Sequence, residues 1–201
     1  ITAILLGQSG LLTEGDNKHE DGLWEEYCFM QKKFSLKPIQ GSLWKKARMR
    51  PQSAPEVRIR QFAHLIYQSE FLFSQLMEAQ TTEKMVELLS IQYDDESAYS
   101  RVQRPLPIGK RSIDILLINT VIPYRYAYAQ SESIKDAIQW LNNIQKEDNT
   151  IIRQWTMLGQ EIRSAADTQA LIHLYQNYCQ PHLCFNCQVG YQVFRSKQLE
   201  L

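Results

Sequence analysis

The stretch VRIRQFAHLIYQSEFLFSQLMEA, residues 57 to 79, decides the fold. Its apolar side chains recur mostly at three- and four-residue steps, the spacing that places them on one face of an α-helix. These side chains belong to Ile59, Phe62, Ala63, Ile66, Leu72, Leu76 and Met77. The pattern predicts one helix, or two joined helices, with a buried face.

Other segments of the chain show the same spacing and begin with residues that favour helix starts. Ser53-Ala54-Pro55-Glu56 places a cap, a first-turn proline and an acid in the right order. Thr81 or Thr82 can cap the next helix, Asn149 or Thr150 a later one, and Gly159 can end it. Strict polar/apolar alternation hardly occurs. We therefore expect an all-α fold: a single, mostly helical orthogonal bundle with little or no sheet.

Length and charge limit the class of protein. The 201 residues are enough for one sizeable core, and we expect residues 1–201 to form a single helical domain. The 22 basic residues balance the 22 acidic ones, so net charge gives no argument for nucleic acid or membrane. The longest apolar run, residues 113–123, is interrupted by polar residues and is too short to span a bilayer.

The start of the chain and its cysteines indicate where the protein works. The opening ITAILLGQSGLL lacks the basic start and the cleavage site of a secretory signal. Four unevenly spaced cysteines fit a reducing compartment better than a disulfide framework, so we expect a cytoplasmic protein. Because the chain starts at Ile1 inside an apolar helical pattern, we expect it to be the C-terminal part of a longer protein.

The segment YCQPHLCFNCQVG, residues 178 to 190, concentrates potential metal ligands. Its cysteines read C-x4-C-x2-C, and thiolate and imidazole groups at short spacing can bind zinc. The ligands of such a site would be Cys179, Cys184, Cys187 and His182. An iron–sulfur cluster would need a fourth thiolate, which only Cys28 could supply. A turn packed against the core, with the cysteines as small apolar side chains, is the favoured alternative, and a disulfide is the least favoured.

The segment WKKARMRPQSAPEVRIR, residues 44 to 60, is called here the basic segment. Its six basic residues face one acid, Glu56. Arginines that project from a loop at a helix start can contact phosphates, and Trp44 could stack on a base. The candidate nucleic-acid contacts are Arg48, Arg50, Arg58 and Arg60. The alternative is structural, with the arginines tied to carboxylates such as those of residues 94–96.

The segment LPIGKRSIDILLINTV, residues 106 to 121, adds Lys110 and Arg111 to these candidate contacts. It loosely resembles the helix–hairpin–helix of DNA glycosylases, in which a glycine hairpin holds a phosphate. Only one glycine, Gly109, is present, and no catalytic aspartate follows the helix. A loop followed by a buried helix is the better interpretation. No glycine-rich phosphate loop, H-E-x-x-H or G-x-S-x-G motif occurs elsewhere.

Several segments, in order along the chain, resemble one bacterial family of proteins of unknown function, DUF2851. They are ILLGQSGLL (4–12), EYCFMQKKFSLKPI (26–39), the stretch from Trp44 through RMRP to Pro55 with RIRQFAHLI (58–66), IGKRSIDILLINTVIPYRYAYA (108–129) and QALIHLYQNYC with the following cysteines and Val-Gly (169–190). The resemblance implies that a nuclease-like N-terminal half precedes this part and that this part positions nucleic acid or regulates the nuclease. It carries over no catalytic residue. It places Cys179, Cys184 and Cys187 at cysteine positions of the family, but not His182.

Three functional hypotheses follow. The preferred one is a non-catalytic helical accessory domain that packs against the N-terminal half through an exposed apolar face on residues 1 to 13. The alternative is a nucleic-acid-binding module that uses the basic segment. A metal-dependent hydrolase at the cysteines is least favoured, because no general base accompanies the candidate ligands.

Overall fold

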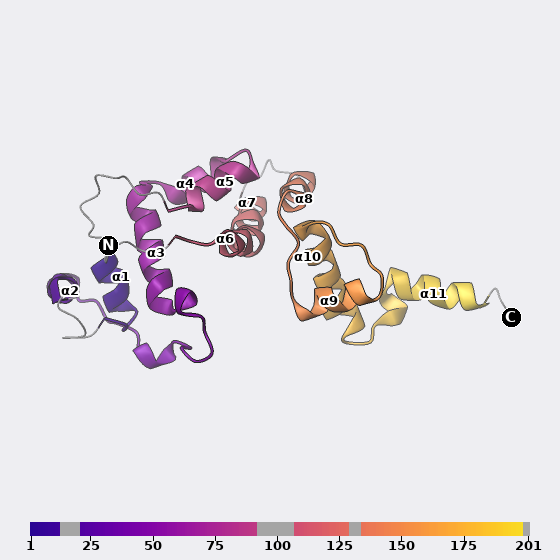
Figure 1. The fold of residues 1–201 in the computed structure, drawn as a ribbon, viewed down its shortest axis with the longest axis horizontal. Helices are drawn as coiled ribbons and strands as arrows, with labels where there is room; N and C mark the ends of the chain where they lie inside the picture. The colour runs from indigo at the N-terminus through magenta and orange to yellow at the C-terminus, as the bar shows by residue number, and fades with distance from the viewer. Residues whose placement is uncertain (13–20, 92–106, 129–133, 199–201) are drawn as a thin grey trace. The chain divides into compact units, whose positions relative to one another are not determined.

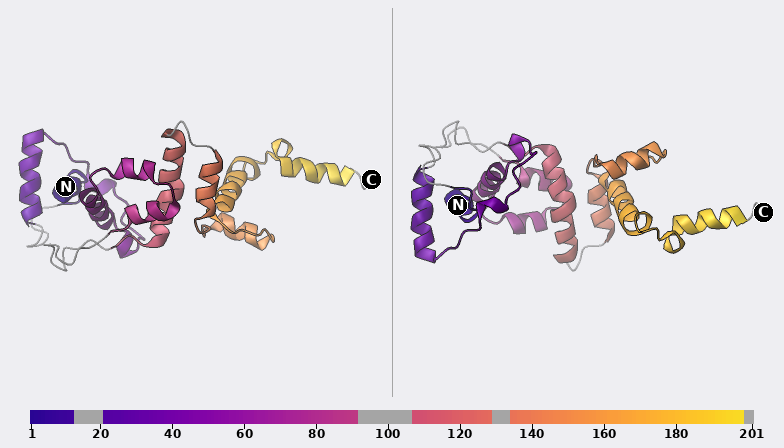
Figure 2. Two further views of the ribbon diagram at one scale, coloured as in Figure 1. Left: turned by 90° about the horizontal axis from the view of Figure 1, so that it is seen from above. Right: turned by 90° about the horizontal axis from the view of Figure 1, so that it is seen from below.

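The computed structural model describes residues 1–12, 21–91, 107–128 and 134–198, which form helices and the turns between them (Figure 1). Within these ranges no strand occurs, and one isolated antiparallel bridge pairs Gln145 with Ser164. Views from above and below show the same coiled ribbons (Figure 2). The predicted all-α fold with little or no sheet is confirmed.

The chain divides into two compact units, Ile1–Ile113 and Asp114–Leu201, which are described separately. Unit 1 contains α1 (Thr2–Gln8), α2 (Asp21–Phe34), η1 (Gly41–Leu43), η2 (Pro51–Ser53), α3 (Pro55–Gln68), α4 (Leu72–Glu78), α5 (Thr82–Leu89) and the start of α6 (Lys110–Leu116). Unit 2 contains the end of α6, η3 (Leu117–Val121), α7 (Ile122–Tyr128), α8 (Ile134–Asn142), α9 (Thr150–Met157), α10 (Ala165–Leu174), η4 (Tyr175–Cys179), η5 (Cys184–Asn186) and α11 (Gln188–Gln198). That residues 1–201 form one domain stays a prediction.

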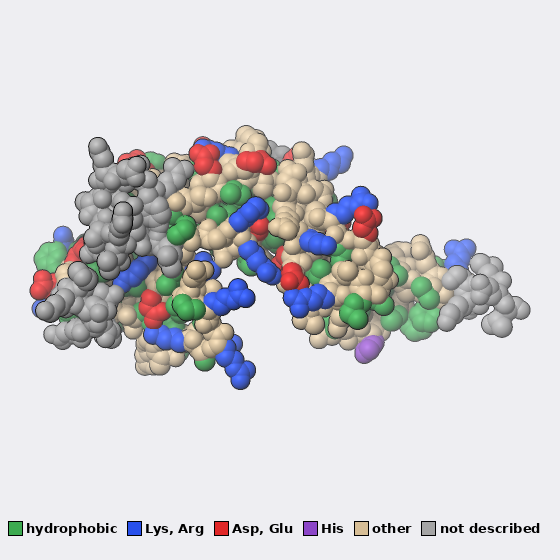
Figure 3. All heavy atoms as spheres, viewed as in Figure 1, with side chains coloured by type: hydrophobic (Ala, Val, Ile, Leu, Met, Phe, Trp, Pro, Cys, Tyr) green, Lys and Arg blue, Asp and Glu red, His purple; other side chains and the backbone are tan. Residues whose placement is uncertain are grey.

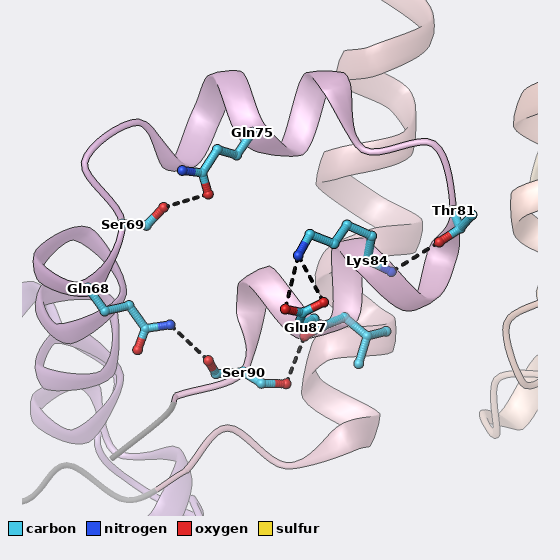
Figure 4. A network of polar contacts seen from close by, with 8 residues as sticks. Gln68, Ser69, Gln75, Thr81, Lys84, Glu87 and Ser90 are labelled. Atoms are coloured by element: carbon cyan, nitrogen blue, oxygen red, sulfur yellow. Dashed lines mark hydrogen bonds and ion pairs between the residues drawn. The ribbon is translucent and has the colours of Figure 1, made fainter. Parts of the chain in front are cut away.

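The stretch that predicted the fold forms two joined helices, α3 and α4. Ser69 ends α3 in an extended conformation, and its hydroxyl donates to the side-chain oxygen of Gln75 at 3.0 Å (Figure 4). Ala63 and Leu76 are buried as expected. Phe62 is 51% exposed, so its predicted burial is wrong. The helical spacing defined the apolar arc, but the neighbouring helices cover only part of it.

Polar caps begin α5 and α9 where the sequence predicted them, whereas the N-cap of α3 is Ala54, which makes no side-chain hydrogen bond, so the cap predicted at Ser53 is wrong. The Thr81 hydroxyl accepts the backbone N–H of Lys84 at 3.2 Å at the start of α5 (Figure 4). The Asn149 side chain accepts a backbone N–H in the first turn of α9, and Gly159 follows the end of α9 with φ +85°. Pro55 occupies the first position of α3, and Glu56 lies in its first turn. The side chains of Thr81 and Asn149 thus accept N–H groups that the helix itself leaves unpaired.

The first helix is part of the core of unit 1. Ala3, Leu6 and Leu12 are buried with Tyr27 of α2. A side chain at Gly7 would overlap the ring of Tyr27, so the helices can approach this closely only with glycine at that position. Ile1 is the one large hydrophobic residue among residues 1–12 that is exposed. The prediction of an exposed apolar face on residues 1 to 13 is therefore wrong for residues 1–12.

Wide helical turns precede two prolines of unit 2: η3 joins α6 to α7, and η4 ends the helix that begins with α10. In η3 the N–H of Ile122 bonds to the carbonyl of Leu117, five residues back, and Pro123 follows. In η4 the N–H of Gln180 bonds to the carbonyl of Tyr175 at 2.8 Å, and Pro181 follows. Proline has no N–H and its ring collides with the carbonyl four residues back in a regular helix, so a wider turn relieves the collision.

An asparagine occupies the same place in both wide turns, four residues before the proline. Asn119 donates its side-chain N–H to the carbonyl of Ile115 at 3.0 Å. Asn177 donates in the same way to the carbonyl of His173 at 3.1 Å. Each side chain therefore supplies a donor to the turn that leads into the widened helix.

Candidate functional site

The loop that carries the basic segment is fastened to α1 at its beginning. The N–H of Ile39 donates to the carbonyl of Gln8 at 2.9 Å, and the indole N–H of Trp44 donates to the carbonyl of Ser9 at 2.8 Å. Gly10 and Gly41 approach so closely that a side chain on either would overlap the backbone of the other. Because Trp44 is half-buried and hydrogen-bonded, this geometry favours anchoring over base stacking.

An ion pair joins the beginning of the loop to the first turn of α3. The Lys46 ammonium lies 2.7 Å from the carboxylate of Glu56 in the first turn of α3. Partial burial acts to raise the pKa of Glu56, but the hydrogen bond from Lys46, a backbone hydrogen bond and the charges of Lys46 and Arg60 outweigh it and lower that pKa. The charge of Lys46 is therefore already paired within the protein.

Arg58 is hydrogen-bonded to other residues of unit 1. Its guanidinium donates to the side-chain oxygen of Gln61 and to the hydroxyl of Ser112, both at 2.9 Å. Gln61 is buried and donates to the carbonyl of Pro107 at 3.3 Å. This network joins α3 to the start of α6. Arg58 thus has partners within unit 1, but these are an amide and a hydroxyl rather than the carboxylates that the structural interpretation named, so that interpretation stays a prediction.

Arg48 and Arg50 differ from the other predicted contacts. Both side chains are exposed, and within the described residues neither makes an ion pair or a side-chain hydrogen bond. Arg48 adopts a left-handed backbone conformation, with φ +60°. Lys and Arg side chains project at the lower edge of unit 1, where Figure 1 places the loop before α3 (Figure 3). The two arginines lie in the solvent-facing part of the basic segment, residues 45–52, which also includes Lys45.

The remaining predicted contacts lie on helices. Arg60 is half-buried on α3, and its charge acts on Glu56. Lys110 and Arg111 are exposed in the first turn of α6, and each interacts with other groups of the protein. Residues 94–96, named as carboxylate partners for the arginines, lie outside the described residues. All six contacts stay predictions as nucleic-acid ligands.

The cysteines lie around the turn between α10 and α11. Cys179 ends η4, Cys184 begins η5, and Cys187 precedes α11; all three are free thiols. Burial, and then the neighbouring Cys187 and Cys184, raise the pKa of Cys179. Phe185 of the turn stacks on Phe194 of α11, with ring centroids 5.1 Å apart. The turn is thus held against α11.

The geometry gives the predicted metal site no support. In the part of the chain that the structure describes, no three His, Cys, Asp or Glu residues are grouped so that they could hold a metal ion. His182 is exposed, with φ +58°. Zinc at Cys179, Cys184, Cys187 and His182 therefore stays a prediction from the sequence alone.

Sequence reasoning missed two buried ionisable residues of unit 2, Asp114 and Arg125. Arg125 of α7 is 2% exposed, and its guanidinium lies 4.1 Å from the ring centroid of Trp140 on α8. A desolvated cation–π contact of this kind contributes about 2 kcal/mol. The sequence signal for a buried arginine was the single basic residue in the apolar stretch IPYRYAYA, residues 122–129.

The described residues define an all-α protein with an exposed basic loop fastened to a small helical core. None of its described helices has the length and apolar character needed to cross a membrane. Residues 1–150 match the model of the family described as protein of unknown function (DUF2851), and the chain belongs to this family. No curated protein and no solved structure matches the chain. The matched range includes the basic segment and Cys28 and ends before Cys179, Cys184 and Cys187.

Proposed function

We propose that this chain is a helical nucleic-acid-binding module that contacts phosphates through the solvent-facing part of its basic segment. The observation that carries the proposal is the exposure of Arg48 and Arg50 on a loop that is fastened at Trp44 and Lys46 and leads into α3. A fastened loop loses little conformational freedom when it binds, so less of the interaction energy is spent on ordering it. Exposed Lys45 lies in the same loop and would add a third contact.

Segregation of charge within the neutral chain supports this proposal. Lys32, Lys33 and Lys37 precede the basic segment, so residues 31–66 carry nine basic side chains and one acidic. The rest of the chain keeps 13 of the 22 basic residues and 21 of the 22 acidic ones. A local excess of this kind attracts a polyanion even when the total charge is zero.

We expect binding that depends on salt and little on sequence. Arginine and lysine side chains on phosphates release condensed counterions, and about three such contacts give a slope near −3 for log K against log salt. Phosphate contacts fix the position of the protein on the nucleic acid but do not distinguish between bases.

We also propose that the protein works in the bacterial cytoplasm, where nucleic acid is accessible and free cysteines stay reduced.

The test is a titration of labelled duplex DNA and of single-stranded RNA at several salt concentrations. The double variant R48A/R50A should lower the salt slope by about 2, roughly 1 per lost phosphate contact, and weaken binding to all sequences alike. K84A is the matched control, because Lys84 is an exposed lysine of unit 1 that is paired with Glu87 at 2.9 Å. Unchanged affinity of R48A/R50A, or binding insensitive to salt, would contradict the proposal.

A second proposal is the accessory role, in which α11 packs against the N-terminal half of a longer DUF2851 protein. Its support is an apolar stripe on α11: Val189 and Val193 are 57% and 51% exposed, although helical spacing places them on one face with Gly190 and Phe194. Replacing Val193 by Asp should abolish binding of this chain to the N-terminal half supplied separately. Lys135→Asp, at an exposed position of α8, is the control, and equal binding of both variants would refute the role.

A further inference from the structure

Cys184 and Cys187 lie at the two ends of one tight turn. The N–H of Cys187 donates to the carbonyl of Cys184 at 3.3 Å, which closes the 3-10 helix η5. Side chains three residues apart in such a turn eclipse each other, and a rise of about 2 Å per residue separates their Cα atoms by about 6 Å. A disulfide needs a Cα separation of about 4.4 to 6.8 Å. The backbone therefore already holds the pair within reach of a disulfide.

The two thiols differ in their access to solvent. Cys184 is exposed, whereas Cys187 is 9% exposed and counts among the buried residues. An outside disulfide can therefore reach Cys184 but not Cys187. This division suits an exchange reaction in which the exposed Cys184 thiolate attacks the small disulfide first and forms a mixed disulfide, which the buried Cys187 then resolves.

Close packing keeps the turn in place against α11. A side chain at Gly190 would overlap the carbonyl of Cys184, and Phe185 stacks on Phe194. Cys179 belongs to the preceding wide turn and is separated from Cys184 by Pro181 and by His182 in its left-handed conformation. The closed turn thus favours Cys187 over Cys179 as the partner of Cys184.

We propose that Cys184 and Cys187 form a reversible dithiol–disulfide site that exchanges with low-molecular-weight disulfides. The Cys184 thiolate attacks one sulfur of the disulfide, whose S–S bond breaks, and one thiolate leaves. The Cys187 thiolate then attacks the Cys184 sulfur of the mixed disulfide and expels the second thiolate. The protein pair loses two electrons and two protons, and the small disulfide gains both and becomes two thiols. Transient disulfides of this kind occur in the cytoplasm. The site lies apart from the basic segment in sequence and goes beyond the proposed function.

The direct test equilibrates the whole chain with mixtures of oxidised and reduced glutathione, with a chelator present so that bound metal does not mask the thiols. Peptide mapping by mass spectrometry should find a bond between Cys184 and Cys187 that reduced glutathione reverses. A chain that keeps four thiols throughout, or a bond that uses Cys179 or Cys28, would overturn the proposal.

Two serine variants separate the roles of the two thiols. C187S should accumulate a glutathione adduct on Cys184, because the resolving thiol is missing. C184S should lose the fast reaction with the small disulfide. C28S is the matched control and should behave like the unchanged protein. Equal rates in C184S and C28S would overturn the proposal, and the mapping of the unchanged chain stands even where a variant fails to fold.

Discussion

At the residue scale, the roles of individual side chains follow from what the fold places beside them. Trp44, Arg58 and Arg125 all carry groups suited to binding nucleic acid, yet each is held by neighbours of its own unit. Arg48 and Arg50 carry the same charge as Arg58 but face solvent. Residue type alone therefore does not separate anchors from contacts, because burial and partners decide between them.

Replacing Gly190 by Ala should loosen α11 from the cysteine turn. The added methyl group would overlap the carbonyl of Cys184, and overpacking of this kind costs about 1–3 kcal/mol. Gly22→Ala is the control, since Gly22 has open space around it in α2. Hydrogen exchange should speed up in α11 of G190A alone. Equal exchange in both variants would show that the helix does not depend on this contact.

The ion pair between Lys46 and Glu56 should contribute to stability at neutral pH. The pKa of Glu56 is lower in the folded protein than its ordinary value of 4.5, so the contribution is present above that value and is lost as pH falls through the folded pKa. Because both groups are partly exposed, we expect at most about 1 kcal/mol.

Urea unfolding at pH 7 and pH 3 measures this contribution. K46A should be less stable than the unchanged protein at pH 7, and this deficit should be smaller at pH 3, below the ordinary pKa of Glu56. K45A, the neighbouring exposed lysine, serves as control and should show no such pH-dependent difference. A K46A deficit as large at pH 3 as at pH 7 would rule out the ion pair as its source.

At the element scale, local sequence predicted where helices begin better than how they continue. Thr81, Asn149 and Pro55 could be found from the sequence because a cap depends on residues within one turn. The wide turns before Pro123 and Pro181 were not predicted. A proline inside an apolar helical pattern is compatible with an end, a kink or a widened turn, and packing of the surrounding helices selects among them.

Replacing Thr81 by Ala should destabilise the helical pair α4 and α5 by about 1 kcal/mol, because one N–H of α5 loses its acceptor. Thr81→Ser keeps the hydroxyl and is the control. Thermal unfolding measures both variants. A loss of stability in T81S as large as that in T81A would assign the effect to the methyl group rather than to the cap.

At the scale of the whole molecule, charge and domain organisation matter most. The basic excess of residues 31–66 lies entirely within unit 1, while the cysteine turn lies entirely within unit 2. The two proposed activities therefore use separate parts of the chain. We therefore expect that removing one leaves the other intact.

Nucleic acid should stabilise the folded chain at low salt. Duplex DNA at about 100 times its dissociation constant stabilises a protein by about 2.7 kcal/mol. For a chain of this length the midpoint should then rise by roughly 5 to 10 °C. Calorimetry measures the shift, which should vanish in R48A/R50A and at high salt.

The same calorimetric scan examines the prediction of one domain. A single domain should unfold in one cooperative transition, and the whole of it should shift with DNA. Two unfolding transitions, of which DNA shifts the midpoint of only one, would instead show that the two units are independent domains.

The sequence by itself determined that this protein is helical, where several helices start, and to which family it belongs. These properties depend on spacing and on residues that are near neighbours in the chain. Only the tertiary structure decided that α1 belongs to the core of unit 1, and that Arg48 and Arg50 are exposed while Arg58 is half-buried and hydrogen-bonded. It also decided that one cysteine of the C-x2-C pair is exposed and the other buried. Burial depends on which helix covers which face, and contacts between residues distant in sequence leave no local pattern to read.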